Sequence, residues 1–370
     1  YNIFLKYMNE NNIEILNIQK LNISTFNNKI LNNVSLKIHK GEMIGLVGES
    51  GSGKSVTALS ILALLDEKAM KIDTGKIFLS NENILEKNEK EMQEIRGNKI
   101  SMIFQEPMTS LNPYHKVGDQ IVESILLHKK QPKHDAILEA KNLMGLVEIP
   151  DVDRRFDSYP HELSGGQRQR IMIAMALANK PKLLIADEPT TALDVTIQAQ
   201  VLDLLLELRQ RFGMAMLFIT HDLGVIGKVA DALCVMQSGQ IVEEGPVKKT
   251  LLTPSNEYTK RLLAAVPSLK KLQLNREGVT KSSEQKPWSS LVKVKDLDIV
   301  YESSAGLLKR SSFTAVSAAN FEIPTGRIIG LVGESGSGKT SLGRALLKAI
   351  PFQAGSIHYQ FKDEKFGLFR

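Results

Sequence analysis

The stretch IGLVGESGSGKS, residues 44–55, decides the fold of this chain. An apolar strand runs into the pattern Gly-x-x-x-x-Gly-Lys-Ser, and a segment with the pattern of an apolar-faced helix follows it. Glycines let the backbone curl so that several N–H groups face one anion, and the N-terminal end of the helix adds a positive dipole. A strand, a glycine loop and a helix in this order predict a phosphate-binding loop rather than an ordinary Gly/Ser-rich turn.

Each residue type in this loop has a chemical reason to be there. Lys54 is expected to reach the β- and γ-phosphates of a nucleotide, and Ser55 is expected to be a ligand of Mg²⁺. The other loop residues predicted to surround the phosphates are Gly48, Ser50, Gly51, Ser52 and Gly53.

Two adjacent carboxylates follow the apolar run LLIA, residues 183–186, in KLLIADEPTTALD. Asp187 is expected to hold the Mg²⁺ shell, and Glu188 to act as the general base toward an attacking water. Alone, such a pair is more often a charged turn after a core strand. The phosphate loop upstream favours the catalytic interpretation.

Two further segments have candidate roles. HELSGGQRQR, residues 161–170, places a serine and two glycines at the start of a helix, which predicts a second anion-binding helix N-terminus. LFITHDLGVI ends an apolar strand at His221, where the imidazole could hydrogen-bond a γ-phosphate. A lone histidine at a strand end is more often structural, so this assignment depends on the other motifs.

The glycine loop occurs twice. IGLVGESGSGKT, residues 329–340, repeats the first copy, and Lys339 follows Lys54 by 285 residues. The flanks correspond as well, since LNNVSLKIHKGEMIGLVG and VSAANFEIPTGRIIGLVG each predict a strand, a glycine turn, an apolar strand and the loop. So long a period indicates domain duplication. We expect a first domain at 13–266, a polar linker at 267–290 and an incomplete second domain at 291–370.

Composition excludes several classes of protein. No apolar run approaches the ~18 residues of a membrane-spanning helix. The single cysteine, Cys234, rules out an internal disulfide or a Cys-based metal site, fits a reducing compartment, and is interpreted as a buried strand residue. The net charge of +6 is weak evidence for binding to nucleic acid or to an anionic membrane, since it lies within the ordinary range of soluble proteins. The low aromatic content, 6%, argues against a base-stacking nucleic-acid platform.

The chain begins at Tyr1, and residues 1–7 lack the features of a signal peptide, so we interpret them as an upstream extension or the cut edge of a longer chain.

Together these residues resemble the nucleotide-binding domain of ABC ATPases. The motifs occur in the family's order after the phosphate loop: the glutamine loop at Gln105 in MIFQEPMTSLNP, LSGGQ at 163–167, the acidic strand with Asp187 and Glu188, the D-loop ending at Asp194, and the switch His221. The resemblance covers 13–266 and resumes at about 291. It implies an α/β fold of the P-loop NTPase class, with a mixed sheet core, an antiparallel β subdomain, an α-helical subdomain that carries LSGGQ, and the start of a second copy.

Two stretches narrow the resemblance. QEPMTSLNP and PSNEYTKRLLAAVPSL, residues 254–269, look like the ATP-binding subunits of oligopeptide, dipeptide and nickel importers, and VKVKDLDIVYESSAGLLKR is similar to their partner subunit. The resemblance implies a fused two-domain ATPase that uses ATP and Mg²⁺ at the cytoplasmic face of the inner or plasma membrane, as a peripheral subunit. The implied partners are permease subunits, a solute-binding protein acting through them, and a second nucleotide-binding domain from its own missing half or another chain; no nucleic acid is expected.

In the mechanism that the resemblance implies, each ATP lies between the phosphate loop of one domain and LSGGQ of the other. Ser164, Gly165, Gly166 and Gln167 would thus cap ATP held at Lys339, and Gln105 would join the Mg²⁺ shell and link ATP to the membrane subunits. Phe26 and Tyr301 are candidates for stacking on adenine. The residues expected to bind nucleotide in the second copy are Gly333, Ser335, Gly336, Gly338, Lys339 and Thr340, with Thr340 as the Mg²⁺ ligand.

Two alternatives stay open from the sequence. One is a soluble ABC ATPase that acts on ribosomes or nucleic acid, which would need an inserted arm or a long charged helical linker. The other is an ATP-binding remnant without turnover, because the sequence after Thr340 contains no glutamine loop, LSGGQ, acidic strand or switch histidine.

Overall fold

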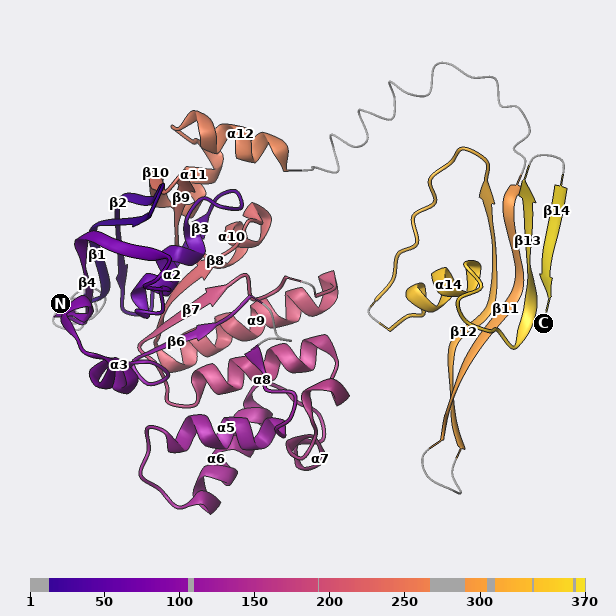
Figure 1. The fold of residues 1–370 in the computed structure, drawn as a ribbon, viewed down its shortest axis with the longest axis horizontal. Coiled ribbons are helices and arrows are strands. Elements are labelled where there is room, and N and C mark those ends of the chain that lie inside the picture. The colour runs from indigo at the N-terminus through magenta and orange to yellow at the C-terminus, as the bar shows by residue number, and fades with distance from the viewer. Residues whose placement is uncertain are drawn as a thin grey trace, which may run out of the picture. The chain divides into compact units, whose positions relative to one another are not determined.

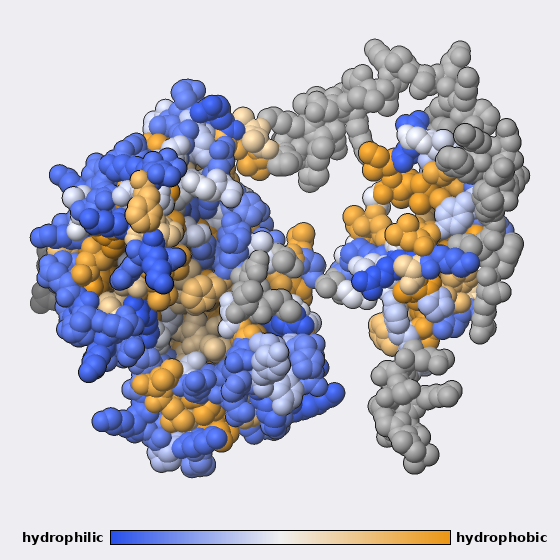
Figure 2. Space-filling model, viewed as in Figure 1, coloured by the Kyte–Doolittle hydropathy of each residue, from blue (hydrophilic) through white to orange (hydrophobic). Residues whose placement is uncertain are grey.

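The computed structural model describes residues 13–105, 110–191, 193–266, 290–304, 310–334, 336–361 and 364–369. The chain forms two compact units, one of residues 1–193 and 197–267, and one made almost wholly of residues 268–370. Figure 1 draws the first from indigo to orange and the second from orange to yellow. Hydrophilic side chains cover most of the visible face of the first unit (Figure 2). No helix in the described part of the chain is long and apolar enough to cross a membrane.

A six-stranded sheet forms the centre of the first unit. Its pairings are parallel except for the antiparallel edge pair β9–β10. The central strands are buried along their whole length, which is why they read as continuous apolar runs. β8 ends two residues before His221, where the sequence pattern placed the strand end. The strand order is β10 (Gln240–Pro246), β9 (Ala232–Gln237), β3 (Met43–Val47), β8 (Ala215–Ile219), β7 (Leu183–Asp187) and β6 (Ile100–Ile103).

An antiparallel sheet makes up the second layer of the first unit. Its longest strands are irregular, with register shifts between Ile18 and Ile23 on β1. Their inward side chains form one core with α2 and with Ile44 and Leu46 of β3. This core ties the phosphate loop to both sheets, because the loop joins β3 to α2. The strand order is β2 (Lys29–His39), β1 (Glu14–Thr25), β4 (Met70–Leu79) and β5 (Glu82–Asn83).

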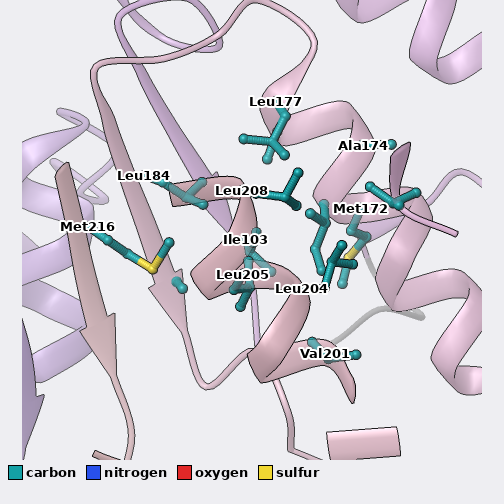
Figure 3. Close-up of a cluster of buried hydrophobic side chains, with 14 of the residues drawn as sticks. Ile103, Met172, Ala174, Leu177, Leu184, Val201, Leu204, Leu205, Leu208 and Met216 are labelled. Atoms are coloured by element: carbon teal, nitrogen blue, oxygen red, sulfur yellow. The ribbon is translucent and has the colours of Figure 1, made fainter. Parts of the chain in front are cut away.

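A second core lies between the six-stranded sheet and the helices. Figure 3 shows Met172 and Leu177 of α8 near Leu204 and Leu208 of α9, with Leu184 of β7 to their left. The apolar run at 171–177 is therefore a core helix. The helices of the first unit are α2 (Lys54–Ile61), α3 (Glu89–Ile95), α5 (Val117–Leu126), α6 (Lys133–Leu146), α7 (Val152–Phe156), α8 (Gly165–Leu177), α9 (Val195–Phe212), α10 (Leu223–Val229), α11 (Val247–Leu252) and α12 (Glu257–Ala265), with 3-10 turns at Ile84–Glu86 and Pro160–Glu162.

The described residues of the second unit form an antiparallel sheet and one helix. Its sheet repeats the order of the antiparallel sheet in the first unit. Val294, Leu297 and Ile357 of the sheet pack against Leu342 and Ala345 of the helix in a small core. The elements are β12 (Arg310–Pro324), β11 (Ser290–Ser304), β13 (Ala354–Phe361), β14 (Glu364–Phe369) and α14 (Lys339–Leu346).

The prediction of an apolar strand before the second glycine loop is wrong. Residues 327–334 belong to no strand, and Ile328 and Val332 are 99% and 90% exposed. Hydrophobic side chains accordingly gather on the visible face of the second unit (Figure 2). The physical reason is the missing pairing: the corresponding β3 lies between β8 and β9, and the described part of the second unit has no such strands.

Candidate nucleotide-binding site

The first glycine loop has the geometry of an anion cradle. Gly51 and Gly53 have φ of 79° and 105°, which side-chain-bearing residues rarely adopt. At Gly48 a Cβ would lie 2.2 Å from the Met236 carbonyl oxygen, so only glycine fits there. Gly53 caps α2 without a side-chain hydrogen bond, which leaves the first N–H groups of the helix for an anion.

Lys54 is buried in this loop, with 7% of its surface exposed. Its Nζ donates hydrogen bonds to the carbonyl oxygens of Gly48 and Glu49, both at 2.8 Å. Burial lowers the pKa of Lys54, and the nearby carboxylates of Glu188 and Asp187 oppose that shift. The ammonium group is therefore held at the loop by carbonyl groups that a phosphate could replace.

Asp187 ends β7 beside the loop and is buried. Burial raises the pKa of its carboxyl, and a hydrogen bond with Ser55 lowers it. Its Oδ1 has no hydrogen-bond partner, which is costly for a buried oxygen unless a cation is bound. The hydroxyl of Ser55 and this oxygen fit Mg²⁺, which needs only one or two protein ligands beside phosphates and water. In the described residues no cluster of three or more His, Cys, Asp or Glu offers a different metal site.

Glu188 lies at the centre of a hydrogen-bonded cluster. Gln105 Nε2 donates to its Oε2 at 3.0 Å, Thr191 Oγ1 donates to the same oxygen at 2.9 Å, and His221 Nδ1 lies 2.9 Å from its Oε1. Burial raises the pKa of Glu188, but the hydrogen bonds from His221 and Thr191 outweigh it, so the pKa lies below its ordinary value. The carboxylate stays ionised, as a proton acceptor must be.

Three of the predicted residues thus meet, and one member of the cluster was not predicted. Gln105, Glu188 and His221 come from three separate segments and converge on one carboxylate. Thr191 was missed, although a hydroxyl three residues after the carboxylate in the turn EPTTALD was a usable signal. Glu188 itself has φ of 47°, a strained conformation of the kind found at functional sites.

The LSGGQ segment begins α8, as the sequence predicted. Ser164 and Gln167 form a capping box, in which each side chain accepts from the other residue's N–H. At Gly166 a Cβ would lie 2.7 Å from Ile197 Cγ2, so this position has room only for glycine. Gly165 is the first residue of the helix, and Asp194 directly precedes α9. The hydrogen bonds of the Ser164 and Gln167 side chains thus stay within the segment itself.

The second loop repeats the local geometry of the first. Lys339 Nζ donates to the Gly333 carbonyl oxygen at 2.8 Å, and Gly336 and Gly338 have positive φ. Thr340 is the second residue of α14, and Ser335 lies outside the described residues.

Neither candidate aromatic residue is a core residue. Phe26 is 92% exposed and borders a hollow of about 540 Å³ between the β1–β2 turn and residues 63–72. Tyr301 is also exposed, and its hydroxyl donates to Ser341 Oγ of α14 at 3.1 Å. Both rings are therefore accessible for stacking.

Comparison with known proteins agrees with this geometry. The family described as ABC transporter matches residues 31–191 and 316–366. The peptidoglycan transport ATP-binding protein YejF of Agrobacterium fabrum is 48% identical over 86% of this chain and 57% of its own length. The glutathione import ATP-binding protein GsiA of Escherichia coli K12 is 42% identical over 93% of this chain and 59% of its own. The chain thus spans about three fifths of the length of these curated relatives.

Solved structures agree on the fold. A dimeric ATP-binding cassette, MJ0796, solved in a post-hydrolysis state with ADP and Pi, is 27% identical. It matches with a TM-score of 0.56 over 63% of this chain and 98% of its own. The expected α/β fold of ABC ATPases is confirmed. The chain belongs to the ABC transporter family.

Proposed function

We propose that this chain is the ATP-hydrolysing subunit of an ABC importer for peptides or related small solutes. The observation that carries the proposal is the environment of Glu188. Its ionised carboxylate is held by Gln105, Thr191 and His221, next to Asp187 at the strand end. A structural ion pair would not need an amide, a hydroxyl and an imidazole from three segments around one acid.

In the proposed reaction the phosphate loop binds ATP. Lys54 exchanges its carbonyl partners for the β- and γ-phosphates, and the loop N–H groups bind the same oxygens. Ser55 and Asp187, with Gln105 nearby, would hold Mg²⁺, which when bound offsets the negative charge of the phosphates. The exposed ring of Phe26 stacks on the adenine.

Glu188 then accepts a proton from the attacking water. The water oxygen forms a bond to the γ-phosphorus, and the bond to the β-phosphate breaks with its electron pair left on ADP. His221 orients the carboxylate and hydrogen-bonds the γ-phosphate. Catalysis of this kind depends mainly on positioning and electrostatics, which matches a preformed hydrogen-bonded cluster.

Pairing of two cassettes completes each site in this proposal. The α8 N-terminus, with Ser164–Gln167, caps ATP that is held by the first phosphate loop of a second chain. This is supported by the dimeric state of the related cassette. The proposed cassettes are 13–266 and 291–370, joined by 267–290, of which 267–289 lies outside the described residues.

The importer assignment rests on the relatives. YejF and GsiA are named for transport of peptidoglycan and import of glutathione, which supports a peptide-like solute here. We propose a peripheral position at the cytoplasmic face of the membrane, with permease subunits and a solute-binding protein as partners. The names of these relatives give no support to an action on ribosomes or nucleic acid.

The test is phosphate release by the purified chain and by Glu188→Gln. Loss of a general base is expected to reduce hydrolysis roughly 10²–10⁴-fold while Mg-ATP still binds. Glu94→Gln, the same change at an exposed glutamate of α3, is the matched control and should hydrolyse at the wild-type rate. Hydrolysis by Glu188→Gln at the rate of the control would contradict the proposal.

A further inference from the structure

A tyrosine outside the described cluster touches the phosphate loop. Tyr258, on α12, is 5% exposed and belongs to the second core, between the six-stranded sheet and the helices. Its hydroxyl oxygen accepts a hydrogen bond from the backbone N–H of Glu49, 3.2 Å away. Glu49 directly follows Gly48, so the bond acts on the loop itself although 209 residues separate the two partners.

Glu49 is held from two sides. Its N–H donates to Tyr258, and its carbonyl oxygen accepts from Lys54 Nζ at 2.8 Å. The N–H of Glu49 and the carbonyl oxygen of Gly48 belong to one peptide group, and that oxygen also accepts from Lys54 Nζ at 2.8 Å. When the ammonium group moves to a phosphate, both carbonyl groups lose Lys54, and the Glu49 carbonyl oxygen keeps the Ser52 N–H at 3.2 Å. The bond to Tyr258 then remains as the side-chain restraint on the peptide group between Gly48 and Glu49.

The position of Tyr258 is itself fixed from β10. The carboxylate of Glu243 accepts from Ser255 N at 2.7 Å, from Ser255 Oγ at 2.8 Å and from Asn256 N at 3.2 Å. Asn256 Oδ1 in turn accepts from Tyr258 N at 2.8 Å and caps α12. A continuous series of hydrogen bonds therefore connects Glu243, through Asn256 and Tyr258, to Glu49 of the phosphate loop.

The second loop offers an internal comparison. It has the same sequence, and Lys339 binds the carbonyl oxygens of Gly333 and Glu334 as Lys54 does in the first loop. Among the described residues of the second unit, however, no side chain accepts a hydrogen bond from the N–H of Glu334. Tyr258 lies 209 residues from Glu49, so its contact does not come from the sequence of the glycine motif itself.

We propose that Tyr258 is a positioning residue for nucleotide binding. Its hydroxyl keeps the peptide of Glu49 in the conformation that the phosphates need, and α12 thereby sets the affinity of the first loop for ATP. The inference rests on the proposed function and adds a determinant to it. A preorganised loop binds more tightly because less conformational freedom is lost on binding.

Tyr258→Phe tests this, because it removes the hydroxyl and keeps the ring in the core. In the Glu188→Gln background, titration calorimetry with Mg-ATP should show affinity reduced roughly 3- to 10-fold, the range of one lost hydrogen bond. Tyr114→Phe makes the same change at an exposed tyrosine and should bind as the parent does. Equal affinity of Tyr258→Phe and Tyr114→Phe would overturn the inference and leave the proposed function intact.

Two further readouts separate positioning from structural support. In the hydrolysing chain Tyr258→Phe should raise KM for ATP and leave kcat within about twofold, and the Tm without nucleotide should match that of Tyr114→Phe. A lower Tm with unchanged KM would show a structural role and overturn the inference. Absence of Mg-ATP binding by the Glu188→Gln parent itself would overturn the proposed function and the inference together.

Discussion

The two glycine loops share the sequence GESGSGK and differ in the strands that lie beside them. Each loop has a lysine bonded to carbonyl groups of its own backbone. Lys54 is buried beside the carboxylates that end β7, whereas Lys339 is partly exposed and follows a segment that pairs with no strand. The motif therefore determines the backbone conformation of the loop. Strands from elsewhere in the chain bury the loop lysine and supply the carboxylates that complete the candidate nucleotide-binding site.

The φ angles of corresponding glycines show that the two loops have the same local conformation. Gly48 and Gly333 have φ of 156° and 159°, and Gly51 and Gly336 have φ of 79° and 82°. The conformation is thus independent of the surroundings. Burial, the raised pKa of Asp187 and the ionised Glu188 come from β7 and β8, which the described second unit does not have.

The largest expected difference is between alanine substitutions of the two loop lysines, Lys54 and Lys339. Lys54→Ala should reduce ATP hydrolysis by the 370-residue chain roughly 100-fold or more, because charge stabilisation by a preorganised group is lost. Lys339→Ala is the matched control at the second loop and should stay within about twofold of wild type. Phosphate release decides between them, and an equal loss in both variants would break the comparison.

The glycines that open the two loops differ in stability cost. Gly48→Ala drives a Cβ to 2.2 Å from the Met236 carbonyl oxygen, while Gly333→Ala meets only Ser337 Oγ at 2.7 Å. A backbone oxygen cannot move aside as a rotating hydroxyl can. We expect Gly48→Ala to lower the free energy of unfolding by about 2 kcal/mol and Gly333→Ala by less than half of that. Denaturant titration followed by circular dichroism measures both, and equal losses would contradict the packing argument.

The hydroxyl of Thr191 gives a test of how hydrogen bonds control the pKa of Glu188. Its hydrogen bond helps to lower the pKa of Glu188, so Thr191→Val should raise that pKa. Since the ionised form is the base, hydrolysis is lost as pH falls through the pKa, and the acidic limb should move to higher pH. At neutral pH the carboxylate stays ionised, and we expect a loss of roughly 5-fold, the size of one ordinary hydrogen bond that positions it. Thr253→Val, at the end of α11, is the control; an unmoved acidic limb would exclude this role.

The smallest expected effect concerns Glu243, which holds the start of α12. In the described residues, only the first loop is in contact with such a helix. Burial raises the pKa of Glu243, but hydrogen bonds from donors at the start of α12 bring it to about 2, against an ordinary 4.5. A depressed folded-state pKa stabilises above 4.5, and that contribution is lost as pH falls toward 2. The Tm difference between wild type and Glu243→Gln should therefore be largest at pH 7 and smaller at pH 3. A difference that grows on acidification would contradict this linkage.

Local patterns predicted much of the fold. The loop, the strand ending at Asp187, the helix that Ser164 caps and the buried strand position of Cys234 follow from short-range sequence and are all present. Gly-rich turns, apolar runs and capping residues act over a few positions, so a single stretch of sequence suffices.

Contacts between distant residues could not be predicted in this way. The bond from Gln105 to Glu188 joins residues 83 positions apart, and that from Glu49 to Tyr258 joins residues 209 apart. The same dependence explains the wrong strand at 327–332, because an apolar run becomes a strand only where a partner strand is available. Sequence periodicity records the tendency and not the partner.

The most direct test of the comparison is the number of Mg-ATP molecules that one chain binds. Titration calorimetry on the Glu188→Gln chain, which should bind ATP and not hydrolyse it, gives this number. The account predicts one tightly bound ATP per chain, lost in Lys54→Ala and kept in Lys339→Ala. Two equal sites per chain, or a site that survives Lys54→Ala and disappears in Lys339→Ala, would contradict it.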